Sequence, residues 1–271
     1  MTLEVLLSCM HQSDDSLVRR SGLTGDVLLV SQGGGTFCKR FNTLHGTARV
    51  FGISDHGLTK SRNWAIAHSQ ADVCLLCDDD EVFVPDYETR ILNAYAQNPT
   101  ADLIIFKMAN QSTAFSDKPH WLHGLALAHI ASWQISFQRQ RLLDARVKFD
   151  ELLGAGSGNG AEEELKFLLD CRRAGLRILY VPIEIASVAQ TDSTWFHGFD
   201  EAFFENRGAT TRYILGLPLS LVYGLYYVAA KRRLYAKSLS PCRALRALLR
   251  GIGANHITRQ AKALRRKEDT P

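Results

Sequence analysis

Three consecutive aspartates, Asp78, Asp79 and Asp80, are the residues whose type and spacing most directly suggest chemistry. They follow the apolar run 72–77, a pattern typical of a buried strand in a parallel sheet. Carboxylates packed this closely repel one another and lose hydration. A divalent cation, Mg²⁺ or Mn²⁺, that bridges their oxygens to a diphosphate would remove the repulsion. The alternative is a turn that caps the next helix, although three aspartates beside Glu81 exceed what a turn requires.

A second group of acids, Glu162, Glu163 and Glu164, follows the glycine-rich stretch GAGSGNG at 154–160. Apolar spacing and a glycine after the last turn predict a helix over 161–175. Acids in a first helical turn stabilise the helix dipole, which explains them without any chemistry. The same carboxylates could instead supply a general base, and the residues alone leave both explanations open.

Apolar runs typical of strands recur through the first half of the chain, and helical patterns fill several of the gaps between them. We expect strands at 3–8, 26–31, 48–53, 72–77 and 101–106, helices at 61–69 and 85–97, and two further strands at 176–181 and 183–189. This alternation predicts an α/β fold with a doubly wound, mostly parallel sheet and helices on both faces. In such sheets ligands bind beyond the carboxyl ends of the strands, where the three aspartates would lie.

The last quarter of the chain differs in composition from the rest. Residues 213–230 carry no charge, and residues 231–271 hold twelve Lys or Arg against two acids, a net charge of +10. Because the whole chain carries +4, the first 230 residues sum to −6. The pattern fits a helix at a membrane surface with a basic tail at anionic headgroups. It fits equally a helix packed on the sheet with a solvated tail.

The six cysteines show no disulfide framework, and the first residues are typical of a strand rather than a targeting peptide. We therefore expect a reduced, cytoplasmic protein. Cys74 and Cys77 form a CxxC, but residues three apart in a strand point to opposite faces, which disfavours a redox or zinc site.

Three longer stretches together resemble the family 2 glycosyltransferases, in particular bacterial members that build surface polysaccharides. They are GLTKSRNWAIAHSQADVCLLCDDDEVF at 57–83, FDELLGAGSGNGAEEELKFLLDCRRAGLRILYVP at 149–182, and STWFHG at 193–198. The resemblance covers about residues 3–200 and implies a GT-A fold. It implies a nucleotide-sugar-binding half at 1–110, an acceptor-binding half at 111–200, and a helical, basic C-terminal region at 201–271.

The resemblance also implies roles for particular residues. The nucleotide-sugar would be bound by Ser8, Met10, Gln32, Arg62, Asp78 and Asp79. The metal would be bound by Asp80, with Asp78 and His197 as further ligands. Where the family shows Glu-Asp, this sequence has three glutamates, and the register places Glu164 at the general base with Glu163 next. Trp195 would stack on the acceptor sugar.

The function implied is inverting, Mn²⁺- or Mg²⁺-dependent transfer of a sugar from a nucleotide-sugar, with a UDP-sugar favoured. The acceptor would be a saccharide or a lipid-linked saccharide of surface polysaccharide synthesis, at the inner face of the cell membrane, with peripheral contact through 213–250. No nucleic acid partner is expected. The alternatives are a nucleotidyltransferase, for which the sequence lacks a basic, glycine-rich loop after its first strand, and a non-catalytic nucleotide-binding protein of the membrane surface. The latter leaves the aspartates unexplained.

Overall fold

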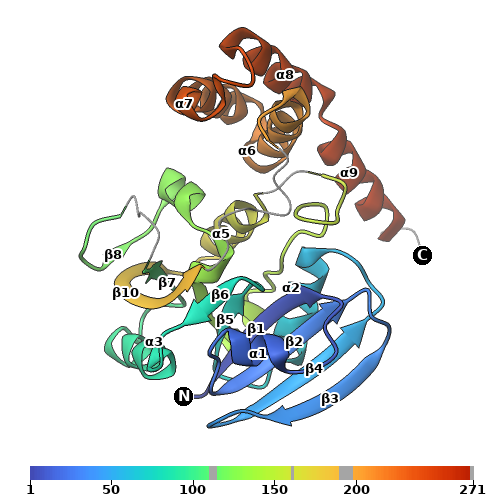
Figure 1. Ribbon diagram of the computed structural model, residues 1–271. Coiled ribbons are helices and arrows are strands. Elements are labelled where there is room, and N and C mark those ends of the chain that lie inside the picture. Colours follow the sequence, from blue (N-terminus) through green and yellow to red (C-terminus); the bar gives the residue numbers. More distant parts are fainter. Residues whose placement is uncertain (110–114, 160–161, 189–197, 269–271) are drawn as a thin grey trace. The chain divides into compact units, whose positions relative to one another are not determined.

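A computed structural model describes residues 1–109, 115–159, 162–188 and 198–268. The chain forms two compact units (Figure 1). The first, called here the sheet unit, comprises residues 1–150 and 163–191. The second, the helical unit, comprises residues 151–162 and 192–271. Each unit is described by itself.

The sheet unit is built on a ten-stranded sheet in the order β3-β4-β2-β1-β5-β9-β7-β10-β6, with β8 beside β10. Its strands are β1 (Leu3–Met10), β2 (Asp26–Gln32), β3 (Phe37–Asn42), β4 (Thr47–Ile53), β5 (Val73–Cys77), β6 (Glu81–Phe83), β7 (Leu103–Met108), β8 (His120–Trp121), β9 (Ile135–Gln138) and β10 (Ile178–Val188). Strands β4, β2, β1 and β5 are parallel neighbours, and so are β7 and β10. The remaining neighbours pair antiparallel.

The predicted α/β class is confirmed, and all five strands expected in the first half are present. Strand β3 was not expected because FCKRFN has no apolar run, and most of its side chains are exposed. The two strands expected at 176–181 and 183–189 are one strand, β10. Its register with β7 shifts after Val181, next to Pro182, which cannot donate a backbone hydrogen bond. The break expected between the two strands is therefore a β-bulge within β10 and not a turn.

The sheet unit also contains the helices α1 (Ser16–Arg20), α2 (Leu58–His68), α3 (Tyr87–Gln97), α4 (Arg139–Asp144) and α5 (Glu163–Arg173), and the 3-10 turns η1 (Gly124–His129) and η2 (Ser132–Gln134). Helix α2 packs on β1 and β2, and α3 packs on β10. Helix α5 buries Leu165, Phe167 and Leu168 and ends before Gly175, whose φ of +87° suits glycine.

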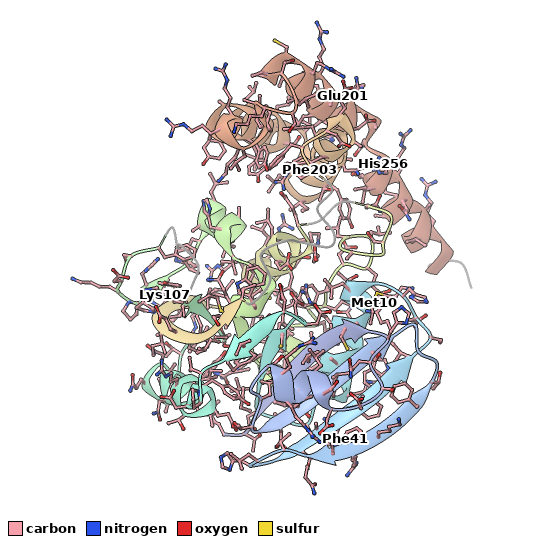
Figure 2. The ribbon with its side chains drawn as sticks, in the orientation of Figure 1. Met10, Phe41, Lys107, Glu201, Phe203 and His256 are labelled. Carbon is pink, nitrogen blue, oxygen red and sulfur yellow. The ribbon has the colours of Figure 1, made fainter. Side chains whose placement is uncertain are left out.

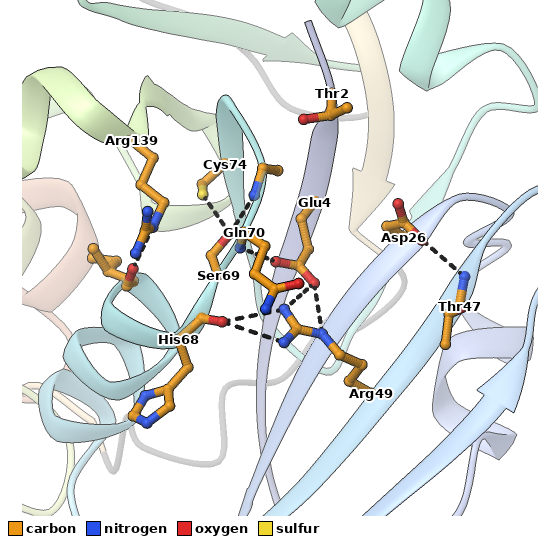
Figure 3. Close-up of polar contacts among 12 residues, drawn as sticks. Thr2, Glu4, Asp26, Thr47, Arg49, His68, Ser69, Gln70, Cys74 and Arg139 are labelled. Atoms are coloured by element: carbon orange, nitrogen blue, oxygen red, sulfur yellow. Dashed lines mark hydrogen bonds and ion pairs between the residues drawn. The ribbon is translucent and has the colours of Figure 1, made fainter.

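A largely buried ion pair fixes α2 to the sheet at the end remote from the aspartates (Figure 3). Arg49 on β4 donates to Glu4 on β1, with its Nη2 2.6 Å from Glu4 Oε1. The same guanidinium donates to the carbonyl of His68, the last residue of α2, at 3.3 Å. Helix carbonyls in the last turn lack intrahelical partners, so Arg49 satisfies one of them and anchors the helix.

The helical unit contains α6 (Glu201–Ala230), α7 (Arg232–Tyr235), α8 (Pro241–Ala254) and α9 (His256–Glu268). Glu201 and Phe203 at the start of α6 and His256 at the start of α9 are labelled in Figure 2. Helices α6 and α8 pack along each other, and their core includes Phe204, Tyr227, Tyr235, Leu248 and Ile252. Helix α8 starts at the cap Ser240, whose hydroxyl accepts the Arg243 N–H, followed by Pro241 at the first helical position.

Two glycines allow this close helix packing. A side chain at Gly251 on α8 would collide with the backbone carbonyl of Glu205 on α6, and one at Gly208 would collide with the carbonyl of Leu248. We predict that Gly251→Ala lowers the free energy of unfolding of the helical unit by about 1–3 kcal/mol, the usual cost of overpacking. Thermal unfolding followed by circular dichroism measures it.

Gly253 on the same helix provides the matched control, because an added Cβ meets nothing within 4 Å there. Gly253→Ala should be neutral or stabilising by up to about 1 kcal/mol, since alanine favours helix. Equal melting temperatures for the two variants would contradict the close packing of α6 on α8.

Candidate active site

The expected site residues gather where parallel strands β1, β2 and β5 end. In the sheet register Met10 lies opposite Gln32, and Leu7 lies opposite Cys77, the residue before the aspartates. Met10 is exposed at the end of β1 and labelled in Figure 2. The carboxyl ends of these strands therefore meet at one edge of the sheet, the usual location of ligands in such folds.

Arg62, on α2, is the centre of this edge. Its Nη2 lies 3.0 Å from Asp78 Oδ1, and its Nη1 lies 3.0 Å from Glu164 Oε1 and 3.7 Å from Glu163 Oε1. One guanidinium thus joins the strand-end aspartates to the acids that open α5, although these groups are about a hundred residues apart in the sequence. The planar, multi-donor guanidinium suits several carboxylates at once.

The Arg62 side chain is only 1% exposed and contacts carboxylates in this structure, and its expected contact with a nucleotide stays a prediction. Burial lowers the pKa of Arg62, but Asp78, Glu164 and Glu163 outweigh burial and raise the pKa above its ordinary value. The guanidinium also lies 5.4 Å from the centre of the Phe149 ring. It is therefore a fixed, buried cation.

Asn63, the second member of the Arg-Asn pair, holds Phe149 in place. Its side-chain amide donates to the Phe149 carbonyl at 2.9 Å, and its side-chain oxygen accepts the Phe149 N–H at 2.8 Å. Two adjacent residues of α2 therefore have different partners. Arg62 binds the carboxylates, and Asn63 binds the backbone of Phe149 beside them.

Asp78 differs from the next two aspartates in its surroundings. Its carboxylate binds Arg62 and accepts a 2.6 Å hydrogen bond from Ser132 Oγ on η2. Its backbone N–H donates to Glu81 at 2.8 Å. Burial, and then the charge of Asp78, raise the pKa of Asp79, of Asp80 and, much more strongly, of Glu81. The strand end is thus a cluster of mutually repelling carboxyls beside the buried Arg62, and Arg20 partly offsets the rise in the pKa of Asp79.

A divalent cation is the cofactor that the resemblance implies. The carboxylates at the end of β5 fit such a cation if a diphosphate binds with it. Among the residues that the structure describes, no three His, Cys, Asp or Glu side chains are grouped to hold a metal ion. Asp78 is already engaged, whereas Asp80 carries a raised pKa that a cation would relieve. Mg²⁺ is usually held by one or two carboxylates together with substrate phosphates. The site fits a cation that binds with a diphosphate, not a cage of protein ligands alone.

Glu163 and Glu164 lie in the first turn of α5 in different surroundings. The Glu163 side chain is 6% exposed, and burial raises its pKa from 4.5 to about 8, with a smaller contribution from Glu164. The Glu164 side chain is 17% exposed. Glu163 is thus a buried acid, and Glu164 is the more accessible carboxylate.

Glu162 belongs to the helical unit, where Arg207 on α6 forms an ion pair with it. The Arg207 guanidinium also lies 4.2 Å from the Tyr227 ring centre and 5.1 Å from that of Phe203. Glu162 has a φ of +82°, a left-handed conformation that is uncommon for a residue with a side chain. The residue just before the two site glutamates thus combines an uncommon backbone conformation with an ion pair to a partly buried arginine.

The other expected residues are placed as follows. The Ser8 hydroxyl lies 2.9 Å from that of Ser61 in a buried pair, and the Gln32 side-chain oxygen accepts the Gly57 N–H at 2.6 Å. Both contacts tie strand ends to the start of α2. Trp195 and His197 lie outside the described residues.

Two residues of the cluster, Ser132 and Phe149, were not identified from the sequence as site residues. Ser132 has no local signal, because it follows no motif and reaches Asp78 only through the fold. Phe149 is the first residue of the stretch 149–182 that resembles the family, but its contact with Arg62 could not be predicted from the sequence.

The CxxC is not a redox or metal site in this fold. Cys74 and Cys77 are both buried, and burial raises the pKa of Cys74 to about 12 and that of Cys77 well above its usual value. A protonated, buried thiol is unreactive.

Residues 38–156 match the family described as glycosyl transferase family 2. No curated protein matches the chain significantly in sequence. Among solved structures, S. aureus TarS 1–349 in complex with UDP-GlcNAc has a TM-score of 0.53 at 12% identity, covering 89% of this chain and 72% of that one. S. aureus TarS 1–349 in complex with UDP has a TM-score of 0.53 at 14% identity, covering 86% and 73%.

Residues 38–156 therefore resemble the glycosyl transferase family 2, the fold is of the GT-A type, and the resemblance stated from the sequence is confirmed. At these identities the TarS structures establish the fold, with the C-terminal helices as an extension of it.

The buried acid leads to a pH prediction. Burial raises the pKa of Glu163 from 4.5 in the unfolded chain to about 8 in the folded protein. Between these values the folded state binds more protons, so this group makes the free energy of unfolding fall as pH rises. We expect Glu163→Gln to remove that fall. Urea unfolding at pH 5, 6.5 and 8 tests it, and parallel pH curves for the two proteins would refute the assignment.

Proposed function

We propose that the chain is an inverting, metal-dependent glycosyltransferase. The observation that carries the proposal is the Arg62 cluster, which brings the strand-end aspartates, through Asp78, and the more accessible Glu164 at the start of α5 to the same place. The first is suited to a cation and diphosphate and the second to a proton acceptor. Sugar transfer from a nucleotide-sugar needs both within one site.

The donor side of the proposed site lies in residues 1–110, at the ends of β1, β2 and β5. Asp80 would hold Mn²⁺ or Mg²⁺, and Asp79 and Met10 would border the nucleotide. A bound cation would neutralise the charge that develops on the departing nucleoside diphosphate. Arg62 keeps Asp78 in place and balances part of the negative charge at this edge.

The acceptor side lies in residues 111–200. Glu164 accepts the proton of the acceptor hydroxyl while that oxygen forms a bond to the anomeric carbon and the diphosphate leaves from the opposite face. Anomeric configuration is thereby inverted. Glu164 is favoured over Glu163 because it is the more exposed of the two, and the raised pKa of Glu163 keeps that carboxyl protonated at neutral pH.

A UDP-sugar is the favoured donor, supported by the TarS structures that hold UDP-GlcNAc and UDP. The proposed acceptor is a saccharide or lipid-linked saccharide in surface polysaccharide synthesis. We place the enzyme in the cytoplasm at the inner face of the membrane, with peripheral contact through 213–250. A panel of nucleotide-sugars incubated with and without Mn²⁺ tests the activity, by the nucleoside diphosphate released.

We predict that Asp80→Ala abolishes Mn²⁺-dependent binding of the nucleotide-sugar and leaves the fold intact, because the side chain is only partly buried. Isothermal calorimetry with UDP-sugar, with and without Mn²⁺, measures the effect. Asp86→Ala is the control, since Asp86 is an exposed aspartate shortly after β6. Unchanged Mn²⁺-dependent affinity in Asp80→Ala would remove the metal assignment.

We predict that Glu164→Gln lowers transfer by roughly 10²–10⁴-fold, the usual scale of general-base catalysis. Donor affinity should hold, because the proposed diphosphate contacts come from β5. Glu163→Gln should retain far more activity, since that carboxyl is already protonated. If Glu163→Gln were inactive and Glu164→Gln nearly normal, the base would be Glu163. If both kept full transfer, the base would lie elsewhere.

A further inference from the structure

The part of α6 that follows Gly216 presents an uncharged apolar surface. Gly216 interrupts the helix with φ 76° and ψ 177°, and Pro218 follows it. Beyond this break, six large apolar side chains are 38–65% exposed, and we call them the apolar face: Leu217, Leu219, Leu221, Val222, Leu225 and Tyr226. Such a continuous exposed apolar surface usually marks a binding surface.

The opposite side of the same segment is used for packing within the helical unit. Ser220, Gly224, Tyr227 and Val228 are buried, and Gly224 lies against Leu248 of α8. Buried and exposed positions alternate with the helical repeat, so α8 occupies one side of α6 and leaves the other free. The apolar face is therefore not a core surface of this unit, and its occupant must come from outside it.

A cluster of positive charge follows directly. We call Lys231, Arg232, Arg233 and Lys237 the basic cluster; in the described part of the chain no ion pair joins any of them to an acid. Two exposed arginines of α8 are paired instead: Arg243 binds Glu201, and Arg250 binds Glu201 and Glu205. The basic cluster thus provides uncompensated charge beside the apolar face.

We propose that the apolar face and the basic cluster together bind the surface of a bilayer that contains anionic phospholipid, with the second half of α6 lying in the interface. The proposal rests on the membrane contact proposed above for 213–250 and assigns it to particular side chains. Apolar side chains would enter the headgroup region, and the basic cluster would bind lipid phosphates.

The helix lies in the interface rather than crossing the bilayer. By length and composition, α6 is the one helix in the described chain that could span a membrane, and 28% of its most apolar window is buried. The break at Gly216 leaves residues 217–230, which at 1.5 Å per residue extend only ~21 Å. The hydrocarbon core is about 30 Å thick. The first half of α6 carries Glu201, Glu205 and Arg207, and cannot supply the remainder.

Deleting residues 231–271 is not a clean test, because it would remove α8 and expose the core of the helical unit. Point variants of exposed side chains avoid this problem. The test is sedimentation of the full chain with vesicles of phosphatidylcholine and phosphatidylglycerol, and with phosphatidylcholine alone. The variants are Val222→Ser/Leu225→Ser in the apolar face and Lys231→Gln/Arg232→Gln/Arg233→Gln in the basic cluster. Leu44→Ser, at a residue 74% exposed in the sheet unit, is the control.

We expect the apolar-face variant to lose at least tenfold in vesicle binding at both low and high salt, because apolar burial is not screened. The basic-cluster variant should lose on the order of a hundred-fold at low salt, with the loss confined to anionic vesicles. Leu44→Ser should bind as the wild type does. All variants should keep nucleotide-sugar hydrolysis without vesicles, so a failed glycosyltransferase assignment would be seen separately.

Two results would overturn the proposal. One is wild-type binding by the apolar-face variant. The other is a wild-type dimer in sedimentation velocity that Val222→Ser/Leu225→Ser dissociates, with no vesicle binding, since a second copy would then cover the face.

Discussion

The site depends on one buried cation. The Arg62 guanidinium pairs with Asp78 at a strand end and with Glu164 at a helix start, and it lies 3.7 Å from Glu163. Without this cation, buried carboxylates so close together would repel one another. Removing one partner of a buried ion pair costs about 3–5 kcal/mol of stability. The stability of this edge of the sheet and the charge of the site are therefore set by the same interaction.

That interaction divides the carboxyls by role. Asp78 is held by Arg62 and Ser132 and behaves as part of the framework. Asp79 and Asp80 are left with raised pKa and without a basic partner as close as Arg62 is to Asp78. In the same way Glu163 is buried and keeps its proton, whereas Glu164 reaches the surface. Neighbouring residues of identical type thus differ in chemistry because of what surrounds them.

Much of the fold could be predicted from the sequence, because apolar runs and helix-end glycines are local signals. The strands β1, β2, β4, β5 and β7 follow such runs, and the aspartates lie at a strand end as expected. What could not be predicted depends on tertiary contacts. No local pattern predicts that the Arg62 side chain is buried, since α2 has no clear apolar stripe. Ser132 joins the site only because antiparallel β9 inserts between β5 and β7. Strand β3 is exposed and polar, and pairing rather than propensity makes it a strand.

The ion pair between Arg207 and Glu162 has a consequence for how this chain can be altered. Glu162 is covalently joined to Glu163, so the glycine-rich loop that leads into the site is folded with α6 and not with the sheet. The boundary between the two units therefore does not fall between the enzyme domain and its C-terminal extension. A chimera that exchanges only the C-terminal helices would separate Glu162 from its arginine and leave the loop without its partner. The loop and the helices form one exchangeable segment, and they are expected to change together during divergence.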